Sequence, residues 1–490
     1  MKDYSKLQNG SDIRGVALEG VEGEHVNLTA LAAEDLSRGF ASWLSDRTGK
    51  PVSDLTVAVG TDSRLSAKAL LESCCNALSS YGVNVLSCGM ASTPAMFMAT
   101  QFKESGCDGA IMITASHLPF NRNGFKYFTK EAGLEKGDIK ALIAKAEAFD
   151  IPENCKGDAA KIKDFDLMAL YCDHIKGLIK NALGGDSPLS GLHIVVDAGN
   201  GAGGFYADKI LKPLGADISG SQFLDPDGSF PNHQPNPENK AAMDSISAAV
   251  LKNNADLGII FDTDVDRSAA VDEKGREIAR NGIVAMAAAL VSEEFPGSTV
   301  VTDSITSTQL KAFLEDDLKM KHLRFKRGYR NVINKGMETE NCHLAIETSG
   351  HAAIKENYWL DDGAYLATKI VIKTARLKKE GKAISEVIAD LKEPLEAKEI
   401  RIKVLSDDFA AYGETVLNEF KLLDSWSFEE PNYEGIRVNT PEGWFLLRKS
   451  LHDPLLPLNI ESDIKGGVEK MQGEIKKQLE GFDKLDLSIF

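Results

Sequence analysis

The chain has 490 residues, of which 43% are apolar, and a formal net charge of −17 at pH 7. That length accommodates about three or four domains of ~150 residues each, and the apolar content is typical of folded globular proteins. The acidic balance disfavours a broad nucleic-acid or anionic-membrane surface, since both partners require Lys and Arg to neutralise phosphates.

The N-terminus leads into no apolar targeting segment, and the chain contains no run of eighteen apolar residues, so we expect a soluble, cytoplasmic protein. Its seven cysteines include the adjacent pair Cys74 and Cys75 but no Cys-x-x-Cys motif. An odd number of cysteines argues against a fully disulfide-bonded protein, and we interpret them as reduced, mostly buried thiols.

Three segments of apolar-biased residues end on an aspartate, and a stretch with helical spacing follows each one. The strand-like segments are 56–62, 193–197 and 298–303, and the helix-like stretches are 67–80, 204–214 and 307–319. Short apolar strands alternating with helices predict α/β domains with mixed or parallel sheets, whose ligands gather at the carboxyl ends of the strands.

The tail from about residue 397 has a different pattern. Strands are predicted at 400–404, 433–438 and 444–447, and helices at 409–419 and 464–479. This pattern indicates a smaller α+β domain. Clusters of turn formers place the domains at 1–185, 186–296, 297–395 and 396–490.

A serine and a histidine stand side by side in Thr114-Ala115-Ser116-His117-Leu118-Pro119, directly after the apolar run 110–113. Ser116 could be an ordinary turn residue or a helix N-cap. It lacks the Gly-x-Ser-x-Gly elbow of α/β hydrolases, so nothing local supports acyl transfer.

Three aspartates at alternate positions, Asp262, Asp264 and Asp266, follow the apolar segment 257–261. In an extended chain they would share one face, where their mutual repulsion favours a bound cation. An EF-hand is rejected because Arg267 stands where that loop requires glycine. The remaining alternative without a metal is a solvent-exposed acidic turn. A serine that carries phosphate beside Mg²⁺ is the chemistry that needs both motifs.

Further cationic residues could complete such a site. Lys126, ten residues after Ser116, is a candidate proton donor or acceptor, and Arg14 and Arg64 are candidate phosphate partners. Each of them could equally be a surface residue. The glycine-rich segment 197–204 has anion-binding geometry in principle, but we favour a tight structural turn and assign it no catalytic role.

Two later loops carry groups that suit a sugar phosphate. Glu347-Thr348-Ser349-Gly350-His351 offers a carboxylate and hydroxyls for sugar hydroxyls. The segment 448–454 offers Arg448, Lys449, Ser450 and His452, which suit a phosphate. Polar loops without a ligand remain the alternative for both.

In their order along the chain, these motifs resemble those of the α-D-phosphohexomutase superfamily, which includes phosphoglucomutase and phosphomannomutase. The resemblance runs from about Asp12 to Pro454 and covers Thr-Ala-Ser-His-x-Pro, Asn-Gly-x-Lys, Asp-x-Asp-x-Asp-Arg and Glu-x-Ser-Gly-His. It implies three similar α/β domains and a C-terminal α+β domain around one central cleft. It also implies hexose-phosphate substrates and a sugar 1,6-bisphosphate as intermediate or activator. We expect a monomer or homodimer, and the acidic charge argues against nucleic-acid and membrane partners.

The resemblance assigns roles to individual residues. Ser116 would be the phosphoserine, and its phosphate would complete a Mg²⁺ site formed by Asp262, Asp264 and Asp266. Arg14, His117 and Arg267 would surround the phosphate, and Lys126 would act in proton transfer. The predicted substrate-binding residues are Arg64, Lys326, Arg327, Gly328, Tyr329, Arg330, Glu347, Ser349, His351, Arg448, Lys449, Ser450 and His452.

The departures from the family pattern fall in the specificity loops. His452 replaces a usual threonine, Lys449 adds charge, and Gly328-Tyr329-Arg330 follows Lys326 and Arg327 in a strongly cationic loop that could favour bisphosphorylated sugars. The leading hypothesis is a Mg²⁺-dependent mutase that interconverts glucose or mannose 1- and 6-phosphates. The alternatives are a glucose-1,6-bisphosphate synthase that uses fructose 1,6-bisphosphate as donor, and a non-catalytic sugar-phosphate sensor.

Overall fold

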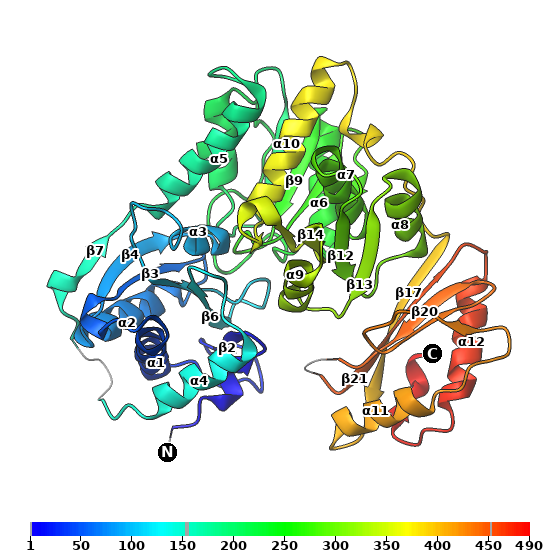
Figure 1. Ribbon diagram of the computed structural model, residues 1–490, viewed down its shortest axis with the longest axis horizontal. Helices are drawn as coiled ribbons and strands as arrows, with labels where there is room; N and C mark the ends of the chain where they lie inside the picture. Colours follow the sequence, from blue (N-terminus) through cyan, green and yellow to red (C-terminus); the bar gives the residue numbers. More distant parts are fainter. Residues whose placement is uncertain (1, 152–155, 451–452) are drawn as a thin grey trace. The chain divides into compact units, whose positions relative to one another are not determined.

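The computed structural model describes residues 2–151, 156–450 and 453–490 (Figure 1). The chain packs as two compact units. The first comprises Met1–Leu290 and Ser349–Val387, and the second comprises Val291–Thr348 and Ile388–Phe490. Three α/β layers and a C-terminal α+β domain make up these units, which confirms the predicted fold class.

The first sheet has the strand order β1-β2-β6-β5-β3-β4-β7. Its strands are β1 (Gln8–Asn9), β2 (Asp12–Val16), β3 (Thr56–Thr61), β4 (Asn84–Met90), β5 (Gly109–Ile113), β6 (Arg122–Thr129) and β7 (Ile162–Asp164). The pairs β3–β4, β3–β5 and β4–β7 are parallel, whereas β6 runs antiparallel to β5 and β2. The sheet is therefore mixed.

Helices on both faces bury this sheet. They are α1 (Ala30–Thr48), α2 (Ala67–Ser80), α3 (Thr93–Met98) and α4 (Lys136–Glu147), and the following helix α5 (Leu167–Leu183) packs on α3. Alternate strand residues such as Val57, Val59 and Ile111 pack under α1, α2 and α4. The intervening residues face α3, and the side chain of Met96 lies over Gly60. Because both faces are covered, the strands are apolar almost throughout.

The second sheet, also in the first unit, has the order β11-β10-β9-β8. Its strands are β8 (Ile194–Asp197), β9 (Leu257–Phe261), β10 (Ser268–Asp272) and β11 (Glu277–Ile278), and its helices are α6 (Lys240–Asn253) and α10 (Gly363–Lys379). α10 packs on β9 and β10 (Figure 1). The antiparallel pair β15 (Ala352–Ile354) and β16 (Leu360–Asp361) completes this unit, and α7 (Asn281–Glu294) leads out of it.

The second unit contains an α/β layer and the C-terminal domain. The α/β layer has parallel strands β12 (Thr299–Asp303), β13 (Lys321–Phe325) and β14 (Cys342–Ile346), with helices α8 (Thr308–Ala312) and α9 (Tyr329–Glu338). The C-terminal sheet has the order β18-β19-β20-β21-β17-β22. Its elements are β17 (Glu396–Val404), β18 (Ser427–Phe428), β19 (Ile436–Asn439), β20 (Gly443–Leu447), β21 (Leu455–Ser462), β22 (Leu485–Asp486), α11 (Phe409–Glu419) and α12 (Gly467–Leu479).

The predicted elements agree with the structure in different degrees. The helices predicted at 67–80 and 409–419 have the predicted bounds. The stretch 204–214 forms a π-helical turn at Tyr206–Leu211 and a 3₁₀ turn at Lys212–Leu214, because Pro213 lacks the N–H that a longer helix requires. The prediction omitted β21, the central strand of the last sheet.

The described cysteines form no disulfide with one another, and Cys74, Cys75, Cys107, Cys172 and Cys342 are buried, as predicted. Among the described helices, none combines the length and apolar character needed to span a bilayer.

Candidate active site

Ser116 lies in the turn that follows β5, at the edge of the first sheet, where the strands end. The Ser116 backbone adopts φ +50°, a left-handed conformation that costs a non-glycine residue about 1–2 kcal/mol. The Ser116 N–H donates to Thr114 Oγ1 at 2.8 Å, and the Leu118 N–H donates to the Ala115 carbonyl at 3.1 Å. The turn therefore presents the Ser116 hydroxyl on a backbone that its neighbours hold in place.

A buried arginine fixes the same turn from below. The Arg64 guanidinium donates to the carbonyls of Pro119 at 2.8 Å, Leu118 at 2.6 Å and Arg122 at 2.9 Å, and it also donates to the carbonyl of Ser116. Its Nε lies 3.4 Å from Asp62 Oδ2. Arg64 was predicted to bind substrate. The structure directs its donors to the backbone of the Ser116 turn, so it positions that turn instead.

The three aspartates lie in the loop between β9 and β10, and all three side chains are fully buried. One carboxylate oxygen of each lies within 4.8 Å of the others, which is a spacing that a metal ion could bridge. Among the described residues, Asp264 Oδ1 and Asp266 Oδ1 have no hydrogen-bond partner. Buried carboxylate oxygens without donors favour a bound cation, since they would otherwise carry a large desolvation cost.

Neighbouring segments hold the backbone of this aspartate loop. The Thr93 N–H at the start of α3 donates to the Asp264 carbonyl, and the Thr93 hydroxyl donates to Asp264 Oδ2 at 2.5 Å. The Ala202 N–H donates to the Thr263 carbonyl, and the Gly363 N–H at the start of α10 donates to the Val265 carbonyl. The loop conformation is therefore set from three sides.

The serine turn and the aspartate loop meet directly. The Ser116 hydroxyl donates to Asp262 Oδ2 at 3.0 Å, and the Arg267 guanidinium donates to Ser116 Oγ at 3.2 Å. Arg267 also donates to Asp262 Oδ2 and to His117 Nδ1, at 3.0 and 2.7 Å. Four of the predicted residues thus form one hydrogen-bonded cluster, in which a cation and a candidate metal ligand both touch the serine oxygen.

Lys126 and Arg14 flank this cluster. The Lys126 ammonium on β6 lies 2.5 Å from Asp266 Oδ2 and 3.9 Å from Asp264 Oδ2. The Arg14 guanidinium on β2 lies 2.8 Å from Asp12 Oδ2 and donates to the Thr114 carbonyl at the base of the serine turn. The two cations therefore reach the aspartate loop and the serine turn from adjacent strands.

Burial and charge shift the acid–base behaviour of the site. Burial, reinforced by Asp266 and Asp264, raises the pKa of Asp262 well above its usual range. Burial acts on Asp266 too, but the Lys126 and Arg267 charges outweigh it and lower the pKa of Asp266. Burial and the Arg267 charge lower the pKa of His117 to about 3, so this imidazole is neutral at physiological pH and accepts a hydrogen bond from Arg267.

The sugar-loop residues divide between the two units. In the first unit, Ser349 Oγ lies 2.9 Å from His351 Nδ1, and His351 Nε2 lies 3.7 Å from carboxylate oxygens of both Asp266 and Asp361. In the second unit, Glu347 Oε1 accepts the Gly328 N–H at 2.7 Å. Ser349 and His351 therefore approach the aspartate loop, whereas Glu347 holds the cationic loop that precedes α9.

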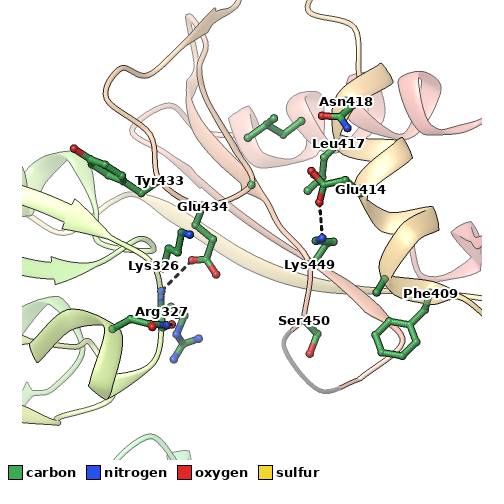
Figure 2. A pocket seen from close by; sticks show the side chains of 14 residues that line it. Lys326, Arg327, Phe409, Glu414, Leu417, Asn418, Tyr433, Glu434, Lys449 and Ser450 are labelled. Carbon is green, nitrogen blue, oxygen red and sulfur yellow. Dashed lines mark hydrogen bonds and ion pairs between the residues drawn. The ribbon is translucent and has the colours of Figure 1, made fainter. Parts of the chain in front are cut away.

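A cavity of about 560 Å³ lies in the second unit (Figure 2). It is lined by residues that include Lys326, Arg327, Phe409, Glu414, Leu417, Tyr433, Glu434, Lys449 and Ser450. The Arg327 N–H donates to Glu434 Oε2 at 3.2 Å. The Lys449 ammonium contacts the carboxylate of Glu414 on α11, so this added positive charge is already paired within the unit.

The structure also places the other residues predicted for phosphate binding in the second unit. Arg448 is buried, and within the described parts of the chain its Nε has no hydrogen-bond partner. The Ser450 hydroxyl accepts the Asp453 N–H at 3.2 Å. Tyr329 and Arg330 form the first turn of α9. His452 lies outside the described residues.

Sequence reasoning missed several residues of the site. Gln234 Nε2 donates to the His117 carbonyl at 2.8 Å, Asn236 Oδ1 accepts from Arg267 at 3.2 Å, and Thr93 binds Asp264. In the second unit, Glu434 accepts from the Ser304 hydroxyl as well as from Arg327. The signal for Gln234 and Asn236 was a long run of Pro, Gly and Asn before α6, since structureless loops of that length are commonly functional.

Comparisons with known protein families agree with this architecture. Three family models of phosphoglucomutase/phosphomannomutase match the chain in order: alpha/beta/alpha domain I at residues 5–149, domain II at 169–275 and domain III at 280–394. Together they cover the three α/β layers.

Individual relatives match nearly the whole chain. A phosphoglucomutase of Neisseria gonorrhoeae is 30% identical over 472 residues, covering 96% of this chain and 95% of the relative. A phosphomannomutase/phosphoglucomutase of Pseudomonas aeruginosa is 29% identical over 475 residues, covering 96% of each. The crystal structure of a phosphoglucomutase/phosphomannomutase family protein from Burkholderia thailandensis superposes with a TM-score of 0.79 at 27% identity, covering 98% of both chains.

Proposed function

The chain belongs to the phosphoglucomutase/phosphomannomutase family and is an enzyme of the phosphohexomutase type, and we propose that it transfers phosphoryl groups to and from hexose phosphates through a phosphoserine at Ser116. The observation that carries this proposal is the contact of the Ser116 hydroxyl with both Asp262 and Arg267. A phosphate on that oxygen would lie between a guanidinium and a cluster of oxygen ligands, which is the environment that phosphoryl transfer requires.

The aspartate cluster fits Mg²⁺. Mg²⁺ prefers oxygen ligands and retains part of its coordination shell for phosphate and water, so three carboxylates supply one face of such a site. The buried, unpartnered oxygens Asp264 Oδ1 and Asp266 Oδ1 support this assignment among the described residues. Asp262, Asp264 and Asp266 would hold this ion, which would supply positive charge next to a phosphate on Ser116.

The residues of the first unit would then have distinct tasks. In the first half-reaction the bond between phosphorus and Ser116 Oγ breaks, and a bond to a sugar hydroxyl oxygen forms as that hydroxyl loses its proton. Arg267 would stabilise the charge that develops on the transferring group, because its guanidinium already contacts Ser116 Oγ. Lys126 is the proposed proton carrier, held beside the aspartates by Asp266. Arg14, on β2, would bind the phosphate carried by Ser116.

The second half-reaction returns a phosphoryl group to Ser116 from the other position of the hexose 1,6-bisphosphate. The anchoring site must therefore accept a phosphate at either end of the sugar. Arg448 and Ser450 are proposed for this role, and the buried, unpartnered Arg448 Nε among the described residues supports it. Lys326 and Arg327 add positive charge at the cavity of the second unit, where Glu347 holds the loop that carries them.

The bisphosphate-synthase alternative rests on the altered phosphate loop, which carries His452 and Asp453, and on the cationic loop 326–330. The pairing of Lys449 with Glu414 bears on the added charge of Lys449 alone, and we propose a mutase. Incubating the phosphorylated enzyme with glucose 6-phosphate should therefore yield glucose 1-phosphate with little free bisphosphate. Accumulating bisphosphate would favour the synthase.

Intact-mass spectrometry tests the chemistry itself. After treatment with glucose 1,6-bisphosphate and Mg²⁺, the protein should gain the mass of one phosphoryl group, and Ser116→Ala should gain none. Absence of the added mass in the unmodified chain would refute both enzyme hypotheses and leave a non-catalytic sugar-phosphate sensor.

A further inference from the structure

The loop of residues 225–238 contacts the site at three separate points. The Arg64 guanidinium lies 5.4 Å from the centroid of the Phe230 ring, which is a cation–π contact. Gln234 Nε2 donates to the His117 carbonyl at 2.8 Å, and Asn236 Oδ1 accepts from Arg267 at 3.2 Å. This one loop therefore contacts Arg64, the serine turn at His117, and Arg267.

His233 anchors this loop to the end of β8. Its Nε2 lies 3.1 and 3.0 Å from the two carboxylate oxygens of Asp197, and its Nδ1 lies 3.0 Å from the Gln234 carbonyl. Both partners only accept hydrogen bonds, so all of these contacts are made only when both ring nitrogens carry a hydrogen, which is the imidazolium form of His233. Asp197 also accepts the Gly199 N–H and the Gln222 side-chain amide, which fixes the carboxylate.

The glycine-rich turn after β8 packs between this loop and the aspartate loop and contacts both of them. A Cβ on Gly199 would lie 2.7 Å from Pro235 Cβ, and a Cβ on Gly201 would lie 2.7 Å from the Thr263 carbonyl oxygen. The turn therefore packs with its backbone against both neighbours. This contact gives a role to a glycine-rich segment that fits no phosphate-binding motif.

We propose that the His233 imidazolium, which binds Asp197 and the Gln234 carbonyl, fixes the conformation of residues 225–238. Gln234 and Asn236 then keep the serine turn and Arg267 in their positions relative to each other. The inference rests on the proposed phosphoserine chemistry, which it deepens by adding Asp197, His233 and Gln234 as positioning residues. None of the three is assigned contact with the sugar or the transferring phosphoryl group.

The conformation of this loop should respond to pH through His233. Asp197 is the charged group that contacts the His233 ring. The other described neighbours of this ring are the Gln234 carbonyl, Gly199 and the Phe223 ring, whose centroid lies 5.3 Å from that of His233. Burial lowers the pKa of His233, but the hydrogen bond and charge of Asp197 outweigh it, and the net shift is upward. The loop contact is therefore fully formed below the ordinary histidine pKa and is lost as the pH rises through the elevated value.

The experiment compares the unmodified chain with His233→Gln, Gln234→Ala and the control Ser229→Ala, an exposed position of the same loop whose hydroxyl contacts Asp227. Phosphoryl transfer is measured from pH 5.5 to 9, and hydrogen–deuterium exchange is measured at residues 114–122. Below the His233 pKa, each test variant should lose about five- to tenfold in kcat, the effect of one hydrogen bond, with KM nearly unchanged. Exchange at 114–122 should rise in both, and Ser229→Ala should match the parent.

The pH profile separates positioning from general loss of structure. The parent should lose kcat as His233 deprotonates, whereas His233→Gln should lack that step. A parent-like profile in His233→Gln, or unchanged exchange at 114–122 in both test variants, would overturn the proposal. If His233→Gln fails to fold, the exposed Gln234→Ala decides by its kcat and exchange. If the parent shows no transfer, the proposed function fails, and the exchange data still test whether the loop holds the serine turn.

Discussion

An Arg64→Lys substitution tests how the chain holds Ser116 in its left-handed conformation. The Arg64 guanidinium donates to four carbonyls of the serine turn and lies beside Asp62, with no exposed side-chain surface. The three donors of a lysine radiate from a single nitrogen, so they cannot reproduce a planar fork that binds carbonyls on two sides. At least two of the four hydrogen bonds should be lost.

The size of the effect follows from these contacts. A hydrogen bond to a charged group contributes about 1.5–3 kcal/mol, so losing two should lower the free energy of unfolding of the first unit by about 3–6 kcal/mol. Ser116 would also leave its position relative to Asp262 and Arg267. A displacement of about 1 Å costs on the order of a hundredfold in rate. We therefore expect Arg64→Lys to transfer phosphoryl groups about a hundred times more slowly than the parent.

Single-turnover transfer from the phosphorylated enzyme to glucose 6-phosphate measures the rate, and urea unfolding measures the stability. The matched control is Arg122→Lys, because Arg122 begins β6 directly after the same turn and its partly exposed side chain pairs with Glu24, where an ion pair contributes about 0–1 kcal/mol. An Arg64→Lys variant that keeps its rate within threefold of the parent would show that the turn does not depend on this guanidinium.

Three further predictions concern the metal, the proton carrier and the second unit. Asp264→Asn should weaken Mg²⁺ binding at least tenfold by calorimetry, because it removes a buried carboxylate charge, and chelation with EDTA should abolish transfer by the parent. Lys126→Gln should lower kcat by about 10²–10⁴-fold in a coupled assay while Mg²⁺ affinity stays within a few fold; an unchanged kcat would exclude Lys126 from proton transfer. Burial outweighs the Arg437 charge and raises the pKa of Glu461 to about 7. The stability that protonated Glu461 contributes is therefore fully present below the pKa of the unfolded chain and is lost as the pH rises through 7. Glu461→Gln should therefore stabilise the chain by about 2–3 kcal/mol at pH 8 and leave its melting temperature at pH 4 unchanged, since a neutral amide resembles the protonated acid.

Local sequence patterns predicted the parts of the fold that depend on local physics. The apolar runs before Ser116 and Asp262 are strands β5 and β9, because both faces of their sheets are covered and select apolar residues throughout. Strand β21 was missed because it contains Pro457, and proline argues against a central strand. The structure accommodates Pro457 because its carbonyl still accepts the Arg448 N–H. On its other side β21 pairs with β17, with Arg401 opposite Pro457, and that pairing joins chain segments far apart in sequence.

The candidate site shows the same division. The aspartate triad could be predicted, since its spacing and charge have a local physical meaning. The contacts of Arg64 could not, because an arginine that binds substrate and one that binds four backbone carbonyls look alike in sequence. His233 and Gln234 were invisible for a related reason: their partners Asp197 and His117 lie 36 and 117 positions away. Only the tertiary fold brings a second-sheet loop to a first-sheet turn.

The residues proposed for phosphoryl transfer and those proposed for substrate binding lie in different units of the chain. Ser116, Arg267, Lys126 and the aspartates belong to the first unit, where hydrogen bonds among them and the loop 225–238 set their geometry. Arg448, Arg327 and Glu347 belong to the second. Binding of Mg²⁺ at the aspartates should therefore survive changes in the second unit that weaken sugar binding. Such a separation would suit the proposed reaction, in which the second unit binds the phosphate at either end of the sugar while the geometry around Ser116 stays the same.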